Sequence, residues 1–227
     1  MTLEHVDILL KVIAFLFAIS VHESAHAWMA NRCGDPTARM LGRITLNPIR
    51  HIDLFGTVLL PLIALWQHIP ILGWAKPTPV DPQNFKNPVW DDILTSIVGP
   101  ISNFLVASGA TVLLLMIGLT SSFGRGVVRG IPMGYIPSDS SSVLVPLCLF
   151  VYELMVINVV LGVFNLIPVP PLDGSHVLRH FLPDAIRRAY DAIGWVGLLA
   201  LIYLAPGLLG RLLNPVLDIF RYVLVTA

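Results

Sequence analysis

The sequence predicts an all-α polytopic membrane protein, and its composition, its apolar runs and its charge distribution lead to that fold class. Of the 227 residues, 56% are hydrophobic and 12% are charged, with a mean hydropathy of +0.79. A soluble domain would carry about twice that share of charged residues. Fourteen basic and fourteen acidic residues cancel, so no net positive field favours a nucleic-acid partner. The expected surroundings are therefore a lipid bilayer.

Four runs are apolar enough for full spans, because a helix needs about 20 residues to cross the bilayer. They are residues 6–30, 93–119, 143–167 and 192–209. A fifth run, 54–72, contains two prolines, a glycine, a glutamine and a histidine, which weaken it as a continuous helix. We therefore expect about five transmembrane elements, with this fifth run as a re-entrant segment.

The basic residues predict the orientation of the spans. Residues 31–53 contain four arginines, and short loops rich in Arg and Lys face the cytoplasm. The first helix should then run inward from an external N-terminus. If residues 54–72 dip into the membrane and return, nine basic residues lie inside and two outside, whereas a full crossing gives six and five. The charge distribution favours the re-entrant arrangement. Non-helical backbone within a membrane is tolerated only where protein or a water-filled cavity covers it, so this segment should line a cavity.

The connecting segments have distinct local patterns. Residues 41–46 have a strand-like composition, and Asn47-Pro48 is typical of a turn. The proline-rich stretch 73–92 should be an extended surface loop. Closely spaced prolines should break the chain after the third span, just before Asp173. From Arg211 onward, apolar residues recur at helical spacing, which predicts an interfacial amphipathic helix at the C-terminus.

A short polar motif, His22-Glu23-Ser-Ala-His26, interrupts the first apolar run. Side chains four residues apart lie on one helix face, so two imidazoles can bind one zinc ion while Glu23 points toward its open position. Paired histidines on an apolar face can instead be packing residues with satisfied ring nitrogens. Because ionisable groups at membrane depth are costly, their clustering favours the metal site and metal-assisted hydrolysis.

The third zinc ligand should come from an acidic residue farther along the chain. A histidine six residues after His26 would complete one soluble protease pattern, but Arg32 stands there. Asp53, Glu153 and Asp173 are the remaining candidates. Asp173 is favoured because it follows a broken helix at the membrane side where the histidine pair is expected.

Five stretches carry a resemblance to a known family. They are H-E-S-A-H at 22–26, G-R-I-T-L-N-P-I-R-H-I-D at 42–53, G-W-A-K-P at 73–77, G-P-I-S-N at 99–103 and N-L-I-P-V-P-P-L-D-G at 165–174. In this order they resemble the site-2 protease family of intramembrane zinc metalloproteases, peptidase family M50. The similarity is to small bacterial or archaeal members that lack an inserted PDZ or CBS domain, and it covers nearly the whole chain.

The resemblance implies a set of residue roles. His22, His26 and Asp173 would bind one zinc ion, and Glu23 would act as general base. Asn103 and Asn165 would help to position the substrate. The segment after the first helix would form a small membrane-associated sheet. Ser175 stands where many relatives have a second glycine, which leaves the ligands unaffected.

Together these expectations describe one intramembrane protease domain over residues 1–227, with a catalytic core at 6–180 and C-terminal helices at 192–227. The first apolar run lacks the basic start and cleavage site of a signal peptide. The expected partner is a transmembrane protein or peptide, cleaved near the cytoplasmic side of the plasma membrane. The alternatives are a metal-binding transporter, whose histidines and acids would line an ion path, and an inactive adaptor of the same fold.

Overall fold

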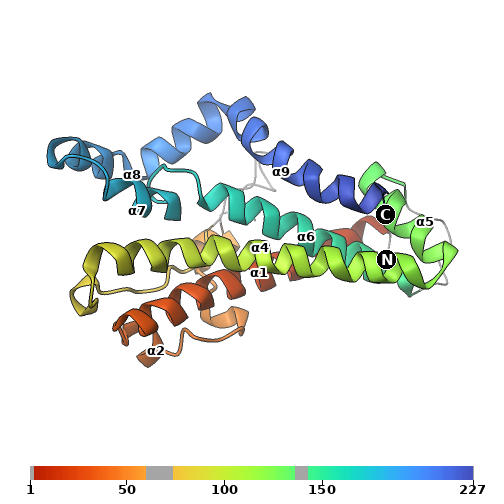
Figure 1. The fold of residues 1–227 in the computed structure, drawn as a ribbon, viewed down its shortest axis with the longest axis horizontal. Coiled ribbons are helices and arrows are strands. Elements are labelled where there is room, and N and C mark those ends of the chain that lie inside the picture. Colours follow the sequence, from red (N-terminus) through yellow and green to blue (C-terminus); the bar gives the residue numbers. More distant parts are fainter. Residues whose placement is uncertain (1–2, 60–73, 136–142, 227) are drawn as a thin grey trace. The chain divides into compact units, whose positions relative to one another are not determined.

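The structure is a computed structural model that describes residues 3–59, 74–135 and 143–226 (Figure 1). Within these ranges the chain forms helices and no strand, which confirms the all-helical class. The long helices are α1 (Leu3–Cys33), α4 (Pro88–Thr120) and α6 (Leu144–Asn165). The two C-terminal helices are α8 (Asp184–Leu204) and α9 (Pro206–Thr226). Short helices α2 (Thr37–Met40), α5 (Ser122–Gly130) and α7 (Asp173–Arg179) connect them.

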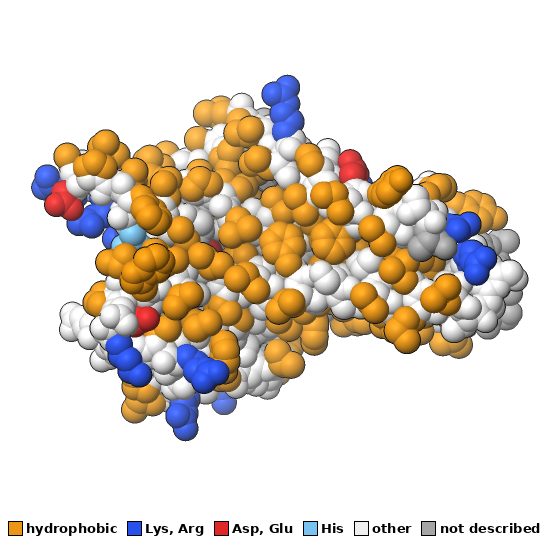
Figure 2. All heavy atoms as spheres, viewed as in Figure 1, with side chains coloured by type: hydrophobic (Ala, Val, Ile, Leu, Met, Phe, Trp, Pro, Cys, Tyr) orange, Lys and Arg blue, Asp and Glu red, His pale blue; other side chains and the backbone are white. Residues whose placement is uncertain are grey.

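Three of the described helices, α1, α4 and α6, are long and apolar enough to cross a membrane. Their surfaces carry large apolar side chains that water would solvate poorly, such as Leu105, Met116 and Leu119 of α4, which are 69%, 60% and 73% exposed. Hydrophobic side chains also cover much of the face drawn in Figure 2. Apolar patches of this extent mark a surface covered by lipid or protein, so the chain is a membrane protein with helical spans.

The chain divides into two compact units. The helical unit contains residues 1–18 and 100–227, and the loop-rich unit contains residues 19–99. Both α1 and α4 contribute residues to each unit.

The helical unit is built by apolar packing. Its main core contains fifteen buried residues from α4, α5, α6, α9 and the adjoining 3₁₀ turn, including Leu114, Met155 and Leu217. A polar pair crosses this core, where Asn103 donates to Asn158 Oδ1 at 2.8 Å and to the Ala18 carbonyl at 3.3 Å. Both asparagines are fully buried. The hydrogen bonds of their side-chain amides satisfy polar groups that would otherwise destabilise the packing.

The loop-rich unit is organised by hydrogen bonds from carboxylates to backbone. Asp35, which is fully buried, accepts from the backbone N–H of Thr37 and of Asp81 and from the Asn84 amide. Burial alone would raise the pKa of Asp35, but these donors outweigh it and hold the pKa below its ordinary value. Asn47 caps the 3₁₀ turn Pro48–Arg50, as the Asn-Pro pattern predicted.

The expected strand at 41–46 is not confirmed, because turns and irregular backbone occupy these residues. Gly42 has a φ of +67° and the Arg43 N–H bonds back to Ala38, so the backbone closes on itself instead of extending. Of the predicted re-entrant run, the structure describes a π-helical turn at Leu54–Leu59; the remainder lies outside the described residues.

The C-terminal region differs from the predicted boundaries. The expected span 192–209 is interrupted at Ala205, and α8 and α9 meet at a bend of 82°. The amphipathic helix forms, but its apolar positions Leu213, Leu217 and Leu224 pack in the core of the helical unit. Other helices of the same chain therefore cover much of the face that the sequence assigned to the membrane interface.

Candidate metal centre

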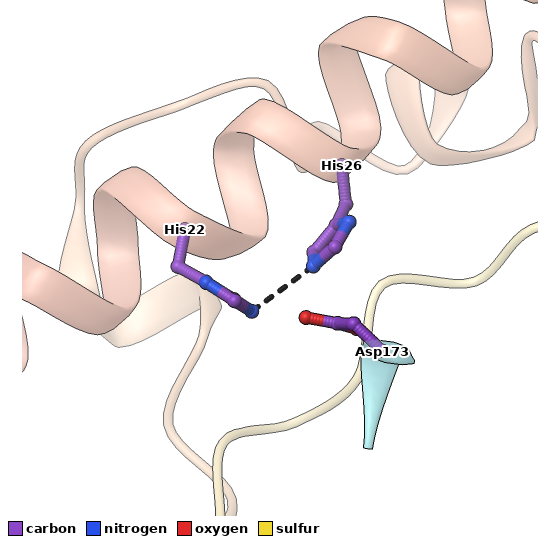
Figure 3. Close-up of side chains that lie close together, drawn as sticks. All are labelled: His22, His26 and Asp173. Carbon is purple, nitrogen blue, oxygen red and sulfur yellow. Dashed lines mark hydrogen bonds between the residues drawn. The ribbon is translucent and has the colours of Figure 1, made fainter. Parts of the chain in front are cut away.

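The motif histidines occupy adjacent turns of α1, where the four-residue spacing places them on one face. Both imidazoles are buried, and His22 Nε2 lies 3.0 Å from His26 Nε2 (Figure 3). A tetrahedral zinc ion bound at about 2.0–2.1 Å to each nitrogen needs them roughly 3.3 Å apart. A shift of a few tenths of an ångström would therefore let the pair bind one ion.

A carbonyl on α4 orients the second histidine. Nδ1 of His26 lies 2.6 Å from the Thr95 backbone oxygen, and because a carbonyl only accepts, Nδ1 carries the proton. The lone pair is then on Nε2, the nitrogen that faces His22. This is the arrangement by which an outer hydrogen bond fixes the tautomer of a metal-binding imidazole.

Gly99 gives the imidazoles the space they occupy. A Cβ at this position of α4 would lie 2.3 Å from His26 Nε2 and 2.7 Å from His22 Cε1. Any side chain at residue 99 would therefore collide with His26 Nε2, one of the candidate metal-binding nitrogens. Thr95 and Gly99 lie one turn apart on α4, so this single face supplies both the orienting acceptor and the free volume.

The general-base candidate Glu23 is next to His22 on α1 and is held by a distant loop residue. Its Oε2 accepts from the Thr78 backbone N–H at 2.9 Å and from Thr78 Oγ1 at 2.8 Å. The carboxylate is partly buried, and these two hydrogen bonds define its orientation.

Asp173 begins α7 after the proline-rich break that the sequence predicted. The following residue must be glycine, since a Cβ on Gly174 would lie 2.3 Å from the Leu166 carbonyl oxygen. One ligand atom from each of His22, His26 and Asp173 lies within 4.8 Å of the others (Figure 3). Two imidazoles and one carboxylate match the ligands of a catalytic zinc. In the described part of the chain this is the one group with three or more potential metal ligands.

The other acidic candidates have different roles. Asp53 Oδ1 accepts from the backbone N–H groups of Phe55 and Gly56 and so caps the π-helical turn. Glu153 lies 3.9 Å from Lys11 Nζ, with its carboxylate mostly buried. Neither belongs to the group of potential metal ligands.

The two asparagines predicted to position substrate have their amides engaged with protein. Asn103 is the buried polar bridge described above. Asn165, at the end of α6, donates to the Leu161 carbonyl one turn earlier. Their substrate role stays a prediction.

Sequence reasoning missed Thr78, Thr95 and Gly99 as parts of the site. Gly99 lies in the G-P-I-S-N stretch, but the sequence does not show why glycine is needed there. The need arises because a histidine ring of α1 approaches Gly99 where α4 packs on α1. Thr95 contributes a backbone atom, which no residue pattern encodes. Thr78 had one readable signal, its position between two prolines in a segment otherwise predicted to be extended.

Comparison with known proteins gives consistent results. Residues 10–204 match the sequence model of a protein family described as "Peptidase family M50". The chain is 35% identical over 211 residues to "Putative zinc metalloprotease YwhC" of Bacillus subtilis, with 92% of this chain and 86% of the relative covered. It is 29% identical to "Putative zinc metalloprotease Rip2" of Mycolicibacterium smegmatis, with 92% and 72% covered. No solved structure matches the chain.

Proposed function

Because the chain belongs to peptidase family M50, we propose that it is an intramembrane zinc endopeptidase that cleaves transmembrane protein segments. His22, His26 and Asp173 would hold the zinc ion, and Glu23 would be the general base. The observation that carries the proposal is the group of three potential ligands, with a glutamate adjacent to the first of them. The names of the relatives support the same chemistry.

The reaction is peptide hydrolysis, in which water attacks the scissile carbonyl and the C–N bond breaks. When bound, zinc supplies Lewis-acid polarisation and lowers the pKa of water. Glu23 accepts a proton from the attacking water and returns it to the leaving amine. Since Oε2 already accepts two hydrogen bonds from Thr78, Oε1 is the oxygen that exchanges this proton.

The proposed substrate must lose helical structure before it reacts. A helical peptide engages its carbonyls in backbone hydrogen bonds, so attack requires local unwinding. Such cleavage within a membrane segment would release a soluble fragment, which is the basis of regulated intramembrane proteolysis. The arginines of residues 32–50 favour a site toward the cytoplasmic side of the plasma membrane.

A transporter would be expected to carry several metal sites through the depth of the membrane. The single ligand group among the described residues favours hydrolysis over transport. An inactive adaptor would need no ligand set, and all the predicted ligands and the base are present in this chain.

Substitution Glu23→Gln tests the proposal. The amide cannot accept the proton, so turnover should fall at least about a thousandfold while zinc stays at one per chain. Membrane proteomics of cells with wild-type or Glu23→Gln protein would identify fragments that depend on the enzyme, and metal analysis would measure zinc. Glu153→Gln, which alters a glutamate paired with Lys11, is the matched control. Unchanged fragments with Glu23→Gln would contradict the proposal.

A further inference from the structure

A loop segment far from the motif in sequence holds the catalytic glutamate. Residues 74–81, here called the strap, have no regular secondary structure and lie against α1. Thr78 makes three contacts with one residue of that helix: its N–H and Oγ1 reach Glu23 Oε2 at 2.9 and 2.8 Å, and Oγ1 lies 3.0 Å from the Glu23 carbonyl oxygen. The strap therefore contacts both the backbone and the carboxylate of the proposed base.

The sequence of the strap explains why Thr78 can be a rigid donor. Prolines at 77 and 79 restrict the residues before them to extended backbone, so Pro79 limits Thr78 itself. The β-branched side chain of threonine has few χ1 rotamers, which limits where its hydroxyl can point. Pro77 and Pro79 have no N–H to donate, whereas the backbone N–H groups of Trp74, Lys76 and Thr78 each donate a hydrogen bond.

Both ends of the strap are anchored. At its start, Trp74 N–H donates to Gly56 O at 3.2 Å, and Thr57 Oγ1 donates to Trp74 O at 2.7 Å. At its end, Asp81 N–H donates at 2.8 Å to Asp35. Thr78 lies between these anchors, neither of which involves Glu23.

We propose that Thr78 is a positioning residue for Glu23: it holds Oε2 through its N–H and hydroxyl and thereby presents Oε1 to the reacting water. This inference rests on the proposed function, in which Glu23 is the base. It adds that the base is oriented by the strap and not by neighbouring turns of α1. A glutamate side chain has several rotatable bonds, and small misplacement of a catalytic group can reduce rate about a hundredfold.

Three substitutions at this position separate the two donors. Thr78→Ser keeps both, Thr78→Val removes the hydroxyl, and Thr78→Pro removes the hydroxyl and the N–H. We expect kcat near wild type for serine, about fivefold lower for valine and roughly a hundredfold lower for proline, following the hydrogen bonds lost. KM and zinc content should stay unchanged, because substrate binding and the metal ligands are not altered.

Thr57→Val is the matched control. It also removes a threonine hydroxyl that holds the strap, but at the strap's start and away from Glu23. If Thr78 merely stabilised the loop, both valine variants would lower kcat equally, and the inference would be wrong. We expect Thr57→Val to retain kcat within about twofold, since the lost bond does not reach the base.

A spectroscopic measurement tests the contact without any substrate. The chain has three glutamates, at positions 4, 23 and 153, so ¹³C-glutamate labelling gives three side-chain carboxylate signals, and Glu23→Gln assigns one of them. Thr78→Val should shift the Glu23 signal, and Thr57→Val should not. Wild-type signal and kcat in both Thr78→Val and Thr78→Pro would overturn the inference. Absence of zinc-dependent cleavage by the wild type would instead overturn the proposed function, while the Glu23 signal would still report on Thr78.

Discussion

The loop-rich unit and the helical unit are stabilised in different ways. The main core of the helical unit contains fifteen buried apolar residues, whereas the apolar cluster around Phe85 in the loop-rich unit has three in the described residues. In the loop-rich unit, carboxylates bind backbone N–H groups instead, as Asp35 and Asp53 do. Apolar packing tolerates small shifts, but hydrogen bonds fix distance and direction.

This difference corresponds to a difference in chemistry. His22, Glu23 and His26 belong to the loop-rich unit, as do their contacts Thr78, Thr95 and Gly99. Of the proposed ligands and base, only Asp173 belongs to the helical unit, at the start of α7 and outside its main apolar core. Substitutions there should change metal binding or turnover. Substitutions in the core of the helical unit should change stability and leave the chemistry of folded protein intact. Three predictions test this separation, in decreasing order of their expected effect on activity.

Gly99→Ala should have the largest effect. The added methyl would lie 2.3 Å from His26 Nε2, so the imidazole must leave the position in which it can bind zinc. We expect zinc content to fall severalfold and turnover at least about a hundredfold, because a displaced ligand also misplaces the reacting groups. Metal analysis and a cleavage assay measure both.

Gly109→Ala is the control for this prediction, since it makes the same change on α4 where no atom lies within 4 Å of the added Cβ. Alanine is the better helix former by about 1 kcal/mol, so this variant should keep its zinc and its stability. Equal zinc content in the two variants would contradict the steric role of Gly99.

Substitution of Asp35 should have an intermediate effect on turnover, because its carboxylate accepts the hydrogen bond from Asp81 N–H at the end of the strap. In Asp35→Asn an N–H₂ replaces one acceptor oxygen and faces a backbone or amide donor, a mismatch that destabilises by about 1–3 kcal/mol. We expect turnover to fall severalfold while zinc is retained. Asp218→Asn, which alters an exposed pair with Arg221, should have no comparable effect.

The same residue predicts a pH dependence. Hydrogen bonds outweigh burial and lower the pKa of Asp35 in the folded state. Its ionised form therefore stabilises the fold fully above the unfolded pKa of about 3.9, and this contribution is lost as the pH falls through the lower folded value. The melting temperature of the wild type should fall below about pH 4. The melting temperature of Asp35→Asn should fall less steeply over the same range. Parallel pH profiles would argue against this role.

The sequence predicted the features that depend on local pattern. The apolar helices α1, α4 and α6 follow from apolar length, and the meeting of the His22 and His26 rings on one helix face follows from a four-residue spacing. The bend at Ala205 and the packing of Leu217 were not predictable in this way. An apolar helix face is compatible with either lipid or protein, and tertiary contacts decide between them.

Candidate-site features that depend on contacts across the sequence were also missed. Thr78 lies 55 residues from Glu23, and Thr95 lies 69 residues from His26. Asn103 shows a related limit, since the resemblance implied only a substrate-positioning role for it. Its amide bridges to Asn158, a partner that only the folded chain identifies.

Leu114→Ala should have the smallest effect on chemistry and a large effect on stability. Leu114 is 1% exposed in the core of the helical unit, and truncating a buried leucine destabilises by about 2–5 kcal/mol. Thermal unfolding in detergent should detect this loss, while zinc per folded chain and kcat remain near wild type. Leu105→Ala on the same helix removes an equal volume from a side chain that is 69% exposed, so its stability should change by less than about 1 kcal/mol. If Leu114→Ala instead lost zinc while still folded, the ligand geometry would depend on apolar packing, and the separation between the two units would fail.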